Sequence, residues 1–307
     1  MDFQRFTKKN IILNIVLVAI YLIWNGFVVG IRDEHYFLIL LWLFSYYSHE
    51  KSRKFIVAFS IFIVYWIVYD SMRILPNYEV SYVHIQEPYT IEKALFGIKV
   101  NNILLTPNEF FAIYHNKFLD LLSGLFYINW VPIPLAFGVY LFLKDKFLFT
   151  RFALVFFLVN IFGFIIYYIY PAAPPWYVDF YGFDLHIGVP GNSARLARFD
   201  EIIGIPIFAN IYNKNANVLA AMPSLHATYP LIVLFYVIKK GLGWMINGLF
   251  VLFMLGIWFA AVYTNHHYII DLLVGIFLTL VVLFLFEKFS DKPFLNRLLQ
   301  AFVNQVQ

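Results

Sequence analysis

Seven long apolar runs dominate this 307-residue sequence, and more polar segments of different lengths separate them. A transmembrane helix needs about 20 apolar residues, because it rises 1.5 Å per residue across a hydrocarbon core of about 30 Å. The seven runs are long enough to span, and a shorter eighth run predicts a further span or a re-entrant segment. The long runs cover residues 11–30, 54–74, 121–144, 151–170, 223–239, 244–263 and 266–286, and the short run covers 36–48.

The composition excludes an ordinary soluble protein. Hydrophobic residues make up 62% of the chain and charged residues 13%, against about 45–50% and about 25% in soluble domains. Lipid must therefore solvate most of the fold, and we expect an all-α polytopic membrane protein with about eight transmembrane helices. The sequence has no cysteine, which excludes disulfides, thiolate nucleophiles and sulfur metal ligands. No basic–aromatic surface indicates binding to nucleic acid.

The basic residues predict an orientation for these spans. With a cytoplasmic N-terminus, 14 of the 22 lysines and arginines fall on the inner side and eight on the outer side, as the positive-inside rule requires. This alternation of inner and outer loops fails if the run at 36–48 does not cross the membrane. We expect one membrane domain over 1–307, with N-terminal helices at 1–75, an outer loop at 76–120, a catalytic core at 121–287 and a cytoplasmic tail at 288–307.

Two long segments lie on the predicted outer side. The first, at 75–120, contains two amphipathic stretches at 91–96 and 109–119, which we expect to form interfacial helices on the membrane. The second, at 171–222, is rich in proline and glycine and contains the string PAAPPWY. Structureless loops of this length are usually functional.

The eight histidines fall into two groups. Three of them, His226, His266 and His267, lie where predicted helices enter the bilayer, and ionisable groups there are costly and usually functional. The others lie in or beside loops with no partner spacing, and we interpret them as solvated or interfacial; they are His35, His49, His84, His115 and His186.

His267 and Asp271 occur in the string NHHYIIDLLVG, four residues apart. On a helix this spacing places both side chains on one face. The aspartate can then accept the proton of one imidazole nitrogen, which fixes the tautomer and leaves the other nitrogen basic. The alternative is a hydrogen-bonded pair that only joins two helices.

His226 occurs in the string AAMPSLHATYP. Pro223 suits the first turn of a helix, whose free amides form an anion site, and Ser224 adds a hydroxyl donor. The alternative is ordinary helix-start chemistry. In the predicted topology the spans that carry His226 and His267 both begin on the outer side. We therefore expect the two imidazoles to meet across a gap the size of a phosphate.

A phosphoryl group also needs cationic donors for its oxygens. Arg195 and Arg198, in GNSARLARFD, precede His226 in the outer loop and could share one helical face. The alternative is that both are charges on a hydrated loop. Zinc is another use for two histidines and an aspartate, but all three would have to converge on one ion. It would leave the arginines without a role.

These strings resemble a known family. PSLHA followed by HHYIID is similar to the last two signatures of the type-2 phosphatidic acid phosphatase superfamily. The first signature, K-x6-RP, is absent, and Ala260 and Ala261 stand where a serine–arginine pair is usual. YPAAPPWYVDFYG, GNSARLARFD, AMPSLHA and TNHHYIIDLLVG together resemble the inositol phosphorylceramide synthases, the fungal aureobasidin target, and their bacterial relatives. The resemblance covers residues 165–280 and continues faintly through YDSMR at 69–73 and EKALFG at 92–97.

The resemblance implies a six-helix phosphatase-like core and a metal-independent, two-step transfer that needs no cofactor. His267 would attack the phosphorus of phosphatidylinositol and expel diacylglycerol, and His226 would protonate the leaving oxygen. His226 would then deprotonate the hydroxyl of ceramide or another lipid alcohol, while Asp271 orients His267. The active site would face the periplasm or lumen.

Further site residues follow from the same resemblance. Arg198, on the LAR string, would hold the phosphate oxygens; a similar role for Arg195 is inferred from its position alone. The remaining candidates for the substrate site are Pro174, Pro175, Trp176 and Tyr177 around the headgroup, and Asp70 and Arg73 at the outer end of their span.

Two other functions remain open from the sequence. A hydrolase with the same site would pass the phosphohistidine to water, and acceptor choice depends on features that sequence describes poorly. A transporter or scaffold would use the histidines for protons or for packing. A transporter should show inverted repeats or broken helices near the middle of the bilayer, and the sequence shows neither.

Overall fold

The computed structural model describes residues 6–213 and 217–307, and α-helices account for most of them. Arg5 and Lys214, two of the charges counted for the orientation, lie outside the described residues. Each of the eight apolar runs forms a helix or a bent helix pair. In chain order these are α1 (Lys8–Trp24) with the π-helical turn η1 (Asn25–Val29), α2 (Asp33–Ser48), α3 (Glu50–Ser71), α6 (Lys117–Tyr127) with η3 (Ile128–Trp130) and α7 (Pro132–Lys144), α8 (Lys146–Ile169), α12 (Leu225–Lys240), α13 (Trp244–Tyr263) and α14 (Ile269–Ser290).

Five of these helices are long and apolar enough to cross a membrane: α1 with η1, α3, α8, α13 and α14. The pair formed by α6, η3 and α7 is a sixth, bent by 43° at its break. Pro132 and Pro134 explain the bend, because proline lacks the amide that would continue the helix. The other two, α2 and α12, have 16 residues each. The chain is an all-α polytopic membrane protein, as predicted.

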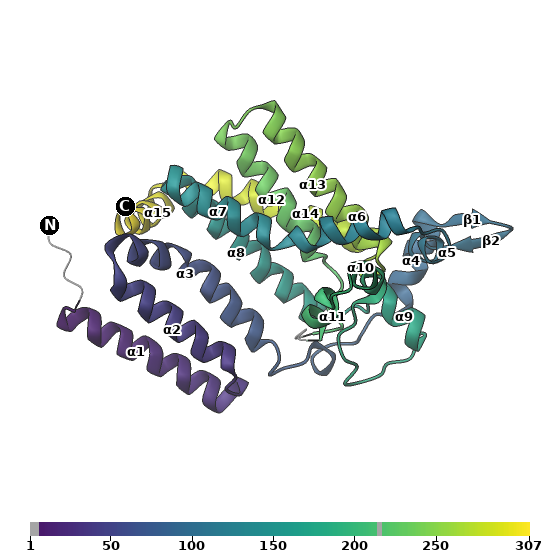
Figure 1. Cartoon of the computed structure of the whole chain (residues 1–307), viewed down its shortest axis with the longest axis horizontal. Helices are drawn as coiled ribbons and strands as arrows, with labels where there is room; N and C mark the ends of the chain where they lie inside the picture. The colour runs from purple at the N-terminus through teal and green to yellow at the C-terminus, as the bar shows by residue number, and fades with distance from the viewer. Residues whose placement is uncertain (1–5, 214–216) are drawn as a thin grey trace.

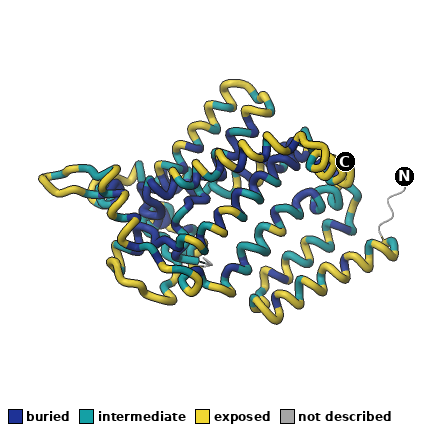
Figure 2. Tube along the Cα trace, turned by 180° about the vertical axis from the view of Figure 1, so that it is seen from behind, coloured by how far each residue is buried: buried dark blue, intermediate teal, exposed yellow. Residues whose placement is uncertain are grey.

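The bundle is centred on α8. This helix packs against α3, α7, α12 and α14, and phenylalanines fill the space between them; Phe149, Phe152 and Phe59 are among the buried rings. In contrast, α1 is exposed along most of its length (Figure 2), with large apolar side chains such as Ile15, Ile20 and Phe27 on its surface. Such a surface requires lipid around it.

The two ends of the bundle differ in charge. One end, which we call the basic end, holds the start of α1 and the C-terminal helix (Figure 1). There Arg151 of α8 pairs with Glu287 of α14 at 2.6 Å, and Lys239 of α12 pairs with the same carboxylate. The tail predicted at 288–307 is mostly the helix α15 (Pro293–Val306), whose buried residues include Leu299. It packs against α8 and α3.

The opposite end, the histidine end, is covered by an outer cap (residues 72–116, 170–213 and 217–222). The cap contains short helices and one hairpin, so the segment at 171–222 is not structureless. The interfacial helices expected in the first outer loop are present as α4 and α5. The cap elements are η2 (Asn77–Glu79), α4 (Gln86–Phe96), β1 (Ile98–Val100), β2 (Ile103–Leu105), α5 (Pro107–Ile113), α9 (Pro175–Tyr181), η4 (Ala194–Leu196), α10 (Ala197–Ile203) and α11 (Ile207–Tyr212).

The hairpin in the cap follows from its turn residues. β1 and β2 pair antiparallel, with Ile98 opposite Leu105. The two residues between the strands, Asn101 and Asn102, both have positive φ angles of 47° and 66°. Asparagine tolerates this conformation, which two-residue hairpin turns require.

Candidate active site

His226 and His267 meet at the histidine end. His226 lies in the first turn of α12, and His267 lies in the turn between α13 and α14. Nδ1 of His226 is 2.9 Å from Nε2 of His267. The two spans therefore begin at the same end, as expected, but the expected phosphate-sized gap is absent. The rings are in direct contact, with 5.1 Å between their centroids.

Asp271 lies on the other side of the His267 ring. Its Oδ2 is 3.5 Å from Nδ1 of His267 and accepts the amide of Tyr268 at 2.8 Å. The Asp271 side chain is fully buried. His267 precedes the first residue of α14, so this carboxylate caps the start of the helix and faces the imidazole from there. The predicted four-residue pairing is thus present as an ion-pair contact at a helix start.

The neighbours of His267 favour one tautomer, although its Nδ1 makes no hydrogen bond with the described residues. In the tautomer with Nδ1–H toward Asp271, Nε2 carries the lone pair and can accept Nδ1–H of His226. The carboxylate and the second imidazole therefore sit on opposite nitrogens of one ring. The side chains of His226, His267 and Asp271 therefore lie in a row and do not surround one point. This arrangement does not match the tetrahedral ligand set that zinc prefers.

Aromatic rings hold His226 in place. The ring of Tyr127 stacks on His226 at 4.9 Å between centroids, and Trp130 meets it edge-on at 4.5 Å. Tyr127 also stacks on His266 at 5.5 Å. Burial lowers the pKa of His266 to about 3, so this ring is neutral, and its Nε2 is 3.1 Å from the carbonyl of Ser193. His266 is therefore a packing residue beside the catalytic pair.

The start of α12 lies close against α14. The amide of Ser224 donates to the carbonyl of Asp271 at 2.9 Å. A Cβ atom added at Gly275 would lie 2.5 Å from the carbonyl oxygen of Ser224, which is closer than a methyl group can approach. Gly275 thus permits the contact that brings His226 beside His267.

Asn108 of α5 clamps the turn that carries His267. Its side-chain amide donates to the carbonyl of Val262 at 2.9 Å and to the carbonyl of His267 at 3.0 Å. Asn265, in the same turn, has a positive φ of 69°, which asparagine tolerates better than most residues. A side chain from the outer cap therefore fixes the backbone of the predicted nucleophile.

Glu92 of α4 clamps the start of α14. Its two carboxylate oxygens accept the amides of Ile269 and Ile270 at 2.9 and 3.1 Å, and the side chain is fully buried. The pKa of Glu92 is raised to about 7, mainly because burial disfavours the carboxylate; the two amides oppose this rise, and the nearby Asp271 carboxylate adds to it. A carboxylate at a helix N-terminus is favoured by the helix dipole.

Arg195 is part of the same clamp. Its guanidinium donates to the carbonyl of Asn108 at 2.5 Å and to the carboxylate of Asp179 at 2.8 Å. Asp179 also accepts from the side chain of Asn265 at 2.7 Å. Both guanidinium contacts are therefore internal, and these contacts favour a positioning role over the phosphate-binding role inferred from the sequence.

Arg198 is held more loosely. Its Nη1 lies 3.6 Å from Oδ1 of Asp120, and no hydrogen bond to this nitrogen is present among the described residues. Asp120 is buried and accepts the hydroxyl of Tyr263 at 2.7 Å. An arginine with a buried nitrogen that lacks a hydrogen bond can take a phosphate oxygen, so Arg198 stays the better candidate of the two arginines.

Ser224 and the PPWY residues have structural contacts of their own. Ser224 is buried and its hydroxyl accepts the amide of Ala227 at 3.3 Å as the N-cap of α12. Pro174 and Pro175 begin α9. Trp176 and Tyr177 are buried in a cluster within the cap, and the amide of Trp176 donates to the carbonyl of Asn265 at 3.1 Å. Contact between these two rings and a headgroup stays a prediction.

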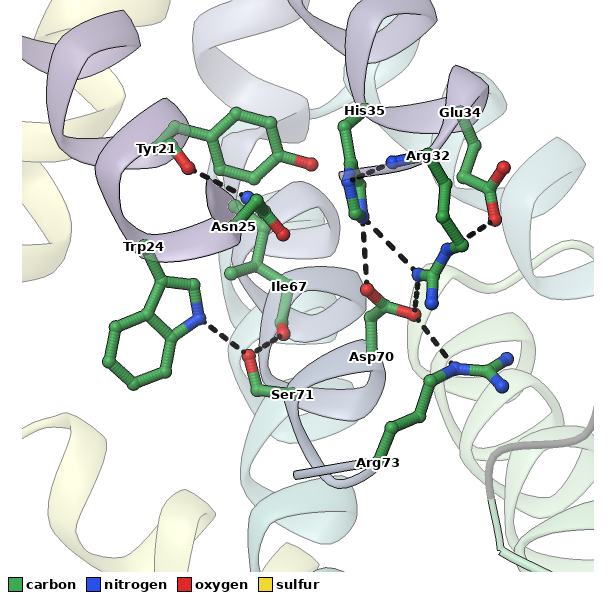
Figure 3. A network of polar contacts seen from close by, with 10 residues as sticks. All are labelled: Tyr21, Trp24, Asn25, Arg32, Glu34, His35, Ile67, Asp70, Ser71 and Arg73. Atoms are coloured by element: carbon green, nitrogen blue, oxygen red, sulfur yellow. Dashed lines mark hydrogen bonds and ion pairs between the residues drawn. The ribbon is translucent and has the colours of Figure 1, made fainter. Parts of the chain in front are cut away.

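Asp70 and Arg73 belong to a second cluster at the ends of α2 and α3. Asp70 contacts Arg32, His35 and Arg73 (Figure 3). His35 is fully buried, so its interpretation as a solvated or interfacial histidine is wrong. The reason is Asp70, which lies 35 residues away in the sequence and supplies a partner that no local pattern reveals.

Five residues that position the histidines were not predicted as site residues: Glu92, Asn108, Tyr127, Trp130 and Asp179. Two of them lie in strings that carry the resemblance, Glu92 in EKALFG and Asp179 in YPAAPPWYVDFYG. The contact between Asn108 and His267 spans 159 residues, and Tyr127 lies among other apolar residues of its span. No spacing rule connects such positions.

Comparisons with known proteins identify the family of the chain. Residues 103–285 match the family model described as PAP2 superfamily. The chain is 46% identical over 282 residues to a phosphoinositol dihydroceramide synthase from Bacteroides thetaiotaomicron, and the match covers 92% of each protein. It is 30% identical to the catalytic subunit of inositol phosphorylceramide synthase from Saccharomyces cerevisiae, covering 67% of this chain and 50% of the yeast protein. The inositol phosphorylceramide synthase of Candida albicans is 27% identical, with 66% and 42% covered. No solved structure matches the chain.

Proposed function

The chain belongs to the PAP2 superfamily, and we propose that it is an inositol phosphorylceramide synthase, a transferase that moves phosphoinositol from phosphatidylinositol to a ceramide-like acceptor. The observation that carries the proposal is the contact between His226 and His267 at 2.9 Å, with Asp271 on the opposite nitrogen of His267. The names of the relatives supply the donor and acceptor classes; the site supplies the chemistry.

In the first step, the lone pair on Nε2 of His267 attacks the phosphorus of the donor. The bond between phosphorus and the diacylglycerol oxygen breaks, and that oxygen takes the proton from Nδ1 of His226, which enters this step as an imidazolium protonated on both nitrogens and leaves it as a neutral imidazole. The products are diacylglycerol and phosphoinositol bound to His267. Asp271 faces Nδ1–H of His267 and stabilises the positive charge that develops on the ring during attack.

In the second step, His226 works in the opposite direction. Its Nδ1, now unprotonated, takes the proton of the acceptor hydroxyl, and the acceptor oxygen attacks phosphorus. The bond between phosphorus and Nε2 breaks, which returns His267 to its starting state. One imidazole therefore serves first as acid and then as base, as the symmetry of the two steps requires.

Arg198 would bind the phosphate oxygens during both steps. The two histidine rings have to part to admit phosphorus, and the amides of the first turn of α12 lie beside that space. The site is at the end of the bundle opposite the basic end, and by the positive-inside rule it would face the extracytoplasmic side. Both substrates are lipids and can reach it from the membrane.

A single assay tests this function. Purified protein is incubated with phosphatidylinositol labelled in the inositol ring, with and without ceramide. The proposal predicts labelled inositol phosphorylceramide when ceramide is present. Release of free inositol phosphate at the same rate in both reactions would show a hydrolase instead. His267→Ala should abolish product formation, and near-normal turnover by this variant would refute the assignment of the nucleophile.

A further inference from the structure

The second polar cluster, at the ends of α2 and α3 nearest the histidine end, is built around Asp70 (Figure 3). Asp70 is 6% exposed and His35 is fully buried. Oδ1 of Asp70 accepts from Arg32 at 2.5 Å and from Arg73 at 3.2 Å, and Oδ2 is 3.1 Å from Nε2 of His35. Two arginines thus meet on one buried carboxylate at the edge of the membrane.

The cluster fixes the state of His35. The backbone amide of Arg32 donates to Nδ1 of His35 at 3.2 Å, so Nδ1 carries no proton and Nε2–H donates to Asp70. His35 is therefore neutral, and the positive charge of the cluster comes from the two arginines. Glu34, which pairs with Nε of Arg32 at 2.9 Å, has a side chain that is 48% exposed, and an exposed pair of this kind contributes little free energy.

An apolar cavity of about 320 Å³ lies between α1, α2 and α3, next to this cluster. Residues of all three helices line it, including Val18, Trp42, Ser60 and Ile67. Tyr21 belongs to the same wall, and its ring points toward His35 (Figure 3), with 5.8 Å between ring centroids. The cavity therefore has an apolar body and a polar end.

The ion pairs around Asp70 do not account for the buried hydroxyl of Tyr21. This oxygen is buried, and it makes no hydrogen bond of normal length and angle with the described residues. A buried hydroxyl without a partner is costly. An oxygen atom on a molecule in the cavity would satisfy it.

We propose that the cavity between α1, α2 and α3 is a binding site for an anionic phospholipid, separate from the histidine site. One acyl chain fills the apolar body, an oxygen of the headgroup region accepts the Tyr21 hydroxyl, and the phosphate lies against Arg32 and Arg73. Basic pockets between transmembrane helices recognise lipid headgroups in this way. The amphipathic shape of the cavity excludes a free anion, which would leave the apolar part empty.

Native mass spectrometry of the delipidated full-length chain tests the proposal. The probes are phosphatidylglycerol and phosphatidylcholine with the same acyl chains, because they share the phosphodiester and differ in net charge. We expect one phosphatidylglycerol to bind at least tenfold more tightly than phosphatidylcholine. Equal affinities would overturn the proposal.

Tyr21→Phe is the sharpest variant. Within the protein the hydroxyl interacts only with the side chain of Asn25, outside normal hydrogen-bond geometry, so the lipid-free melting temperature should fall little. Its hydrogen bond to a headgroup oxygen should be lost, which predicts about tenfold weaker binding of phosphatidylglycerol. Tyr36→Phe is the matched control, because Tyr36 lies on α2 beside His35 and is half exposed. Unchanged affinity in Tyr21→Phe would overturn the proposal.

Ser60→Leu tests the apolar body of the cavity independently. The larger side chain should fill the space that the acyl chain needs and weaken phosphatidylglycerol binding without removing any charge. If Ser60→Leu binds this lipid as well as the unmodified chain, the acyl chain does not occupy the cavity. Both variants report on lipid binding, so their outcome does not depend on the transferase reaction at the histidines.

Discussion

Nδ1 of His226 and Nε2 of His267 are 2.9 Å apart, a normal hydrogen-bond distance. In the proposed mechanism, the proton of this contact lies on Nδ1 of His226, from which the leaving oxygen would take it. The lone pair on Nε2 of His267 would accept that hydrogen bond until a substrate parts the rings. The proposed acid and the proposed nucleophile of the first step would then be the two partners of one hydrogen bond.

The first prediction concerns His226. His226→Ala should lower the rate of both half-reactions by about 10²–10⁴, the usual contribution of a general acid or base. His267 remains in this variant, so slow formation of the phosphorylated protein should still be measurable in a single-turnover experiment. His186→Ala is the control, because His186 is exposed on the outer cap. A rate for His226→Ala within tenfold of normal would exclude its role as acid and base.

The second prediction concerns Asp271. Asp271→Asn keeps the shape of the side chain and can still accept the amide of Tyr268, but it no longer favours a protonated Nδ1 on His267. We expect turnover to fall by about 10³-fold or more, as when the aspartate of a catalytic triad is replaced. The melting temperature should change little. The exposed Asp184→Asn serves as control, and normal turnover in Asp271→Asn would show that the carboxylate only caps α14.

The third prediction concerns pH. The pKa of Glu92 is raised from 4.5 to about 7 in the folded chain, so the folded state keeps this proton where the unfolded state loses it. The contribution of neutral Glu92 to the free energy of unfolding is complete below pH 4.5 and is lost as pH rises to about 7. The loss should be on the order of 3 kcal/mol.

Glu92→Gln should remove most of this pH dependence. Melting temperatures measured from pH 4.5 to pH 8 would reveal it, with the half-exposed Glu87→Gln of the same helix as control. The variant should also lower turnover, because an amide group cannot accept hydrogen bonds from both Ile269 and Ile270. Parallel pH curves for Glu92→Gln and the unmodified chain would contradict the assignment.

The fourth prediction separates the two arginines. Arg195→Ala removes the hydrogen bond to the carbonyl of Asn108 and leaves Asp179, whose side chain is 40% exposed, without its cation. Losing a hydrogen bond from a charged group costs about 1.5–3 kcal/mol, so the melting temperature should fall. Arg198→Ala should instead lower kcat/KM by about 10²-fold with a smaller change in melting temperature. Arg198→Lys should recover only part of this loss, because lysine lacks the planar fork of donors. The opposite pattern would exchange the two roles.

The helices and the proximity of His226 and His267 could be predicted from the sequence for physical reasons that are local. Apolar runs long enough to span a bilayer form helices whatever surrounds them. The strings around His226 and His267 each combine a helix start with an ionisable group, and a consistent topology places the two starts together. The structure confirmed the all-α membrane fold, and the comparisons confirmed the family.

What the sequence did not predict depends on contacts between distant segments. Glu92 meets Ile269 across 177 residues, and Arg151 meets Asp291 across 140, so no periodicity marks either pair. The closed contact between the histidine rings also escaped prediction, because side-chain conformation depends on Tyr127 and Trp130 from another helix. The burial of His35 escaped it for the same reason.

The central claim is that His267 carries the phosphoryl group between the two lipids. It is tested most directly by mixing the chain with phosphatidylinositol labelled in the inositol ring, without acceptor, and quenching the reaction in alkali, which preserves phosphohistidine. Peptide mass spectrometry should then find phosphoinositol on His267, and added ceramide should remove it before the quench. Turnover to inositol phosphorylceramide with no label on His267, or with label on another residue, would contradict the account.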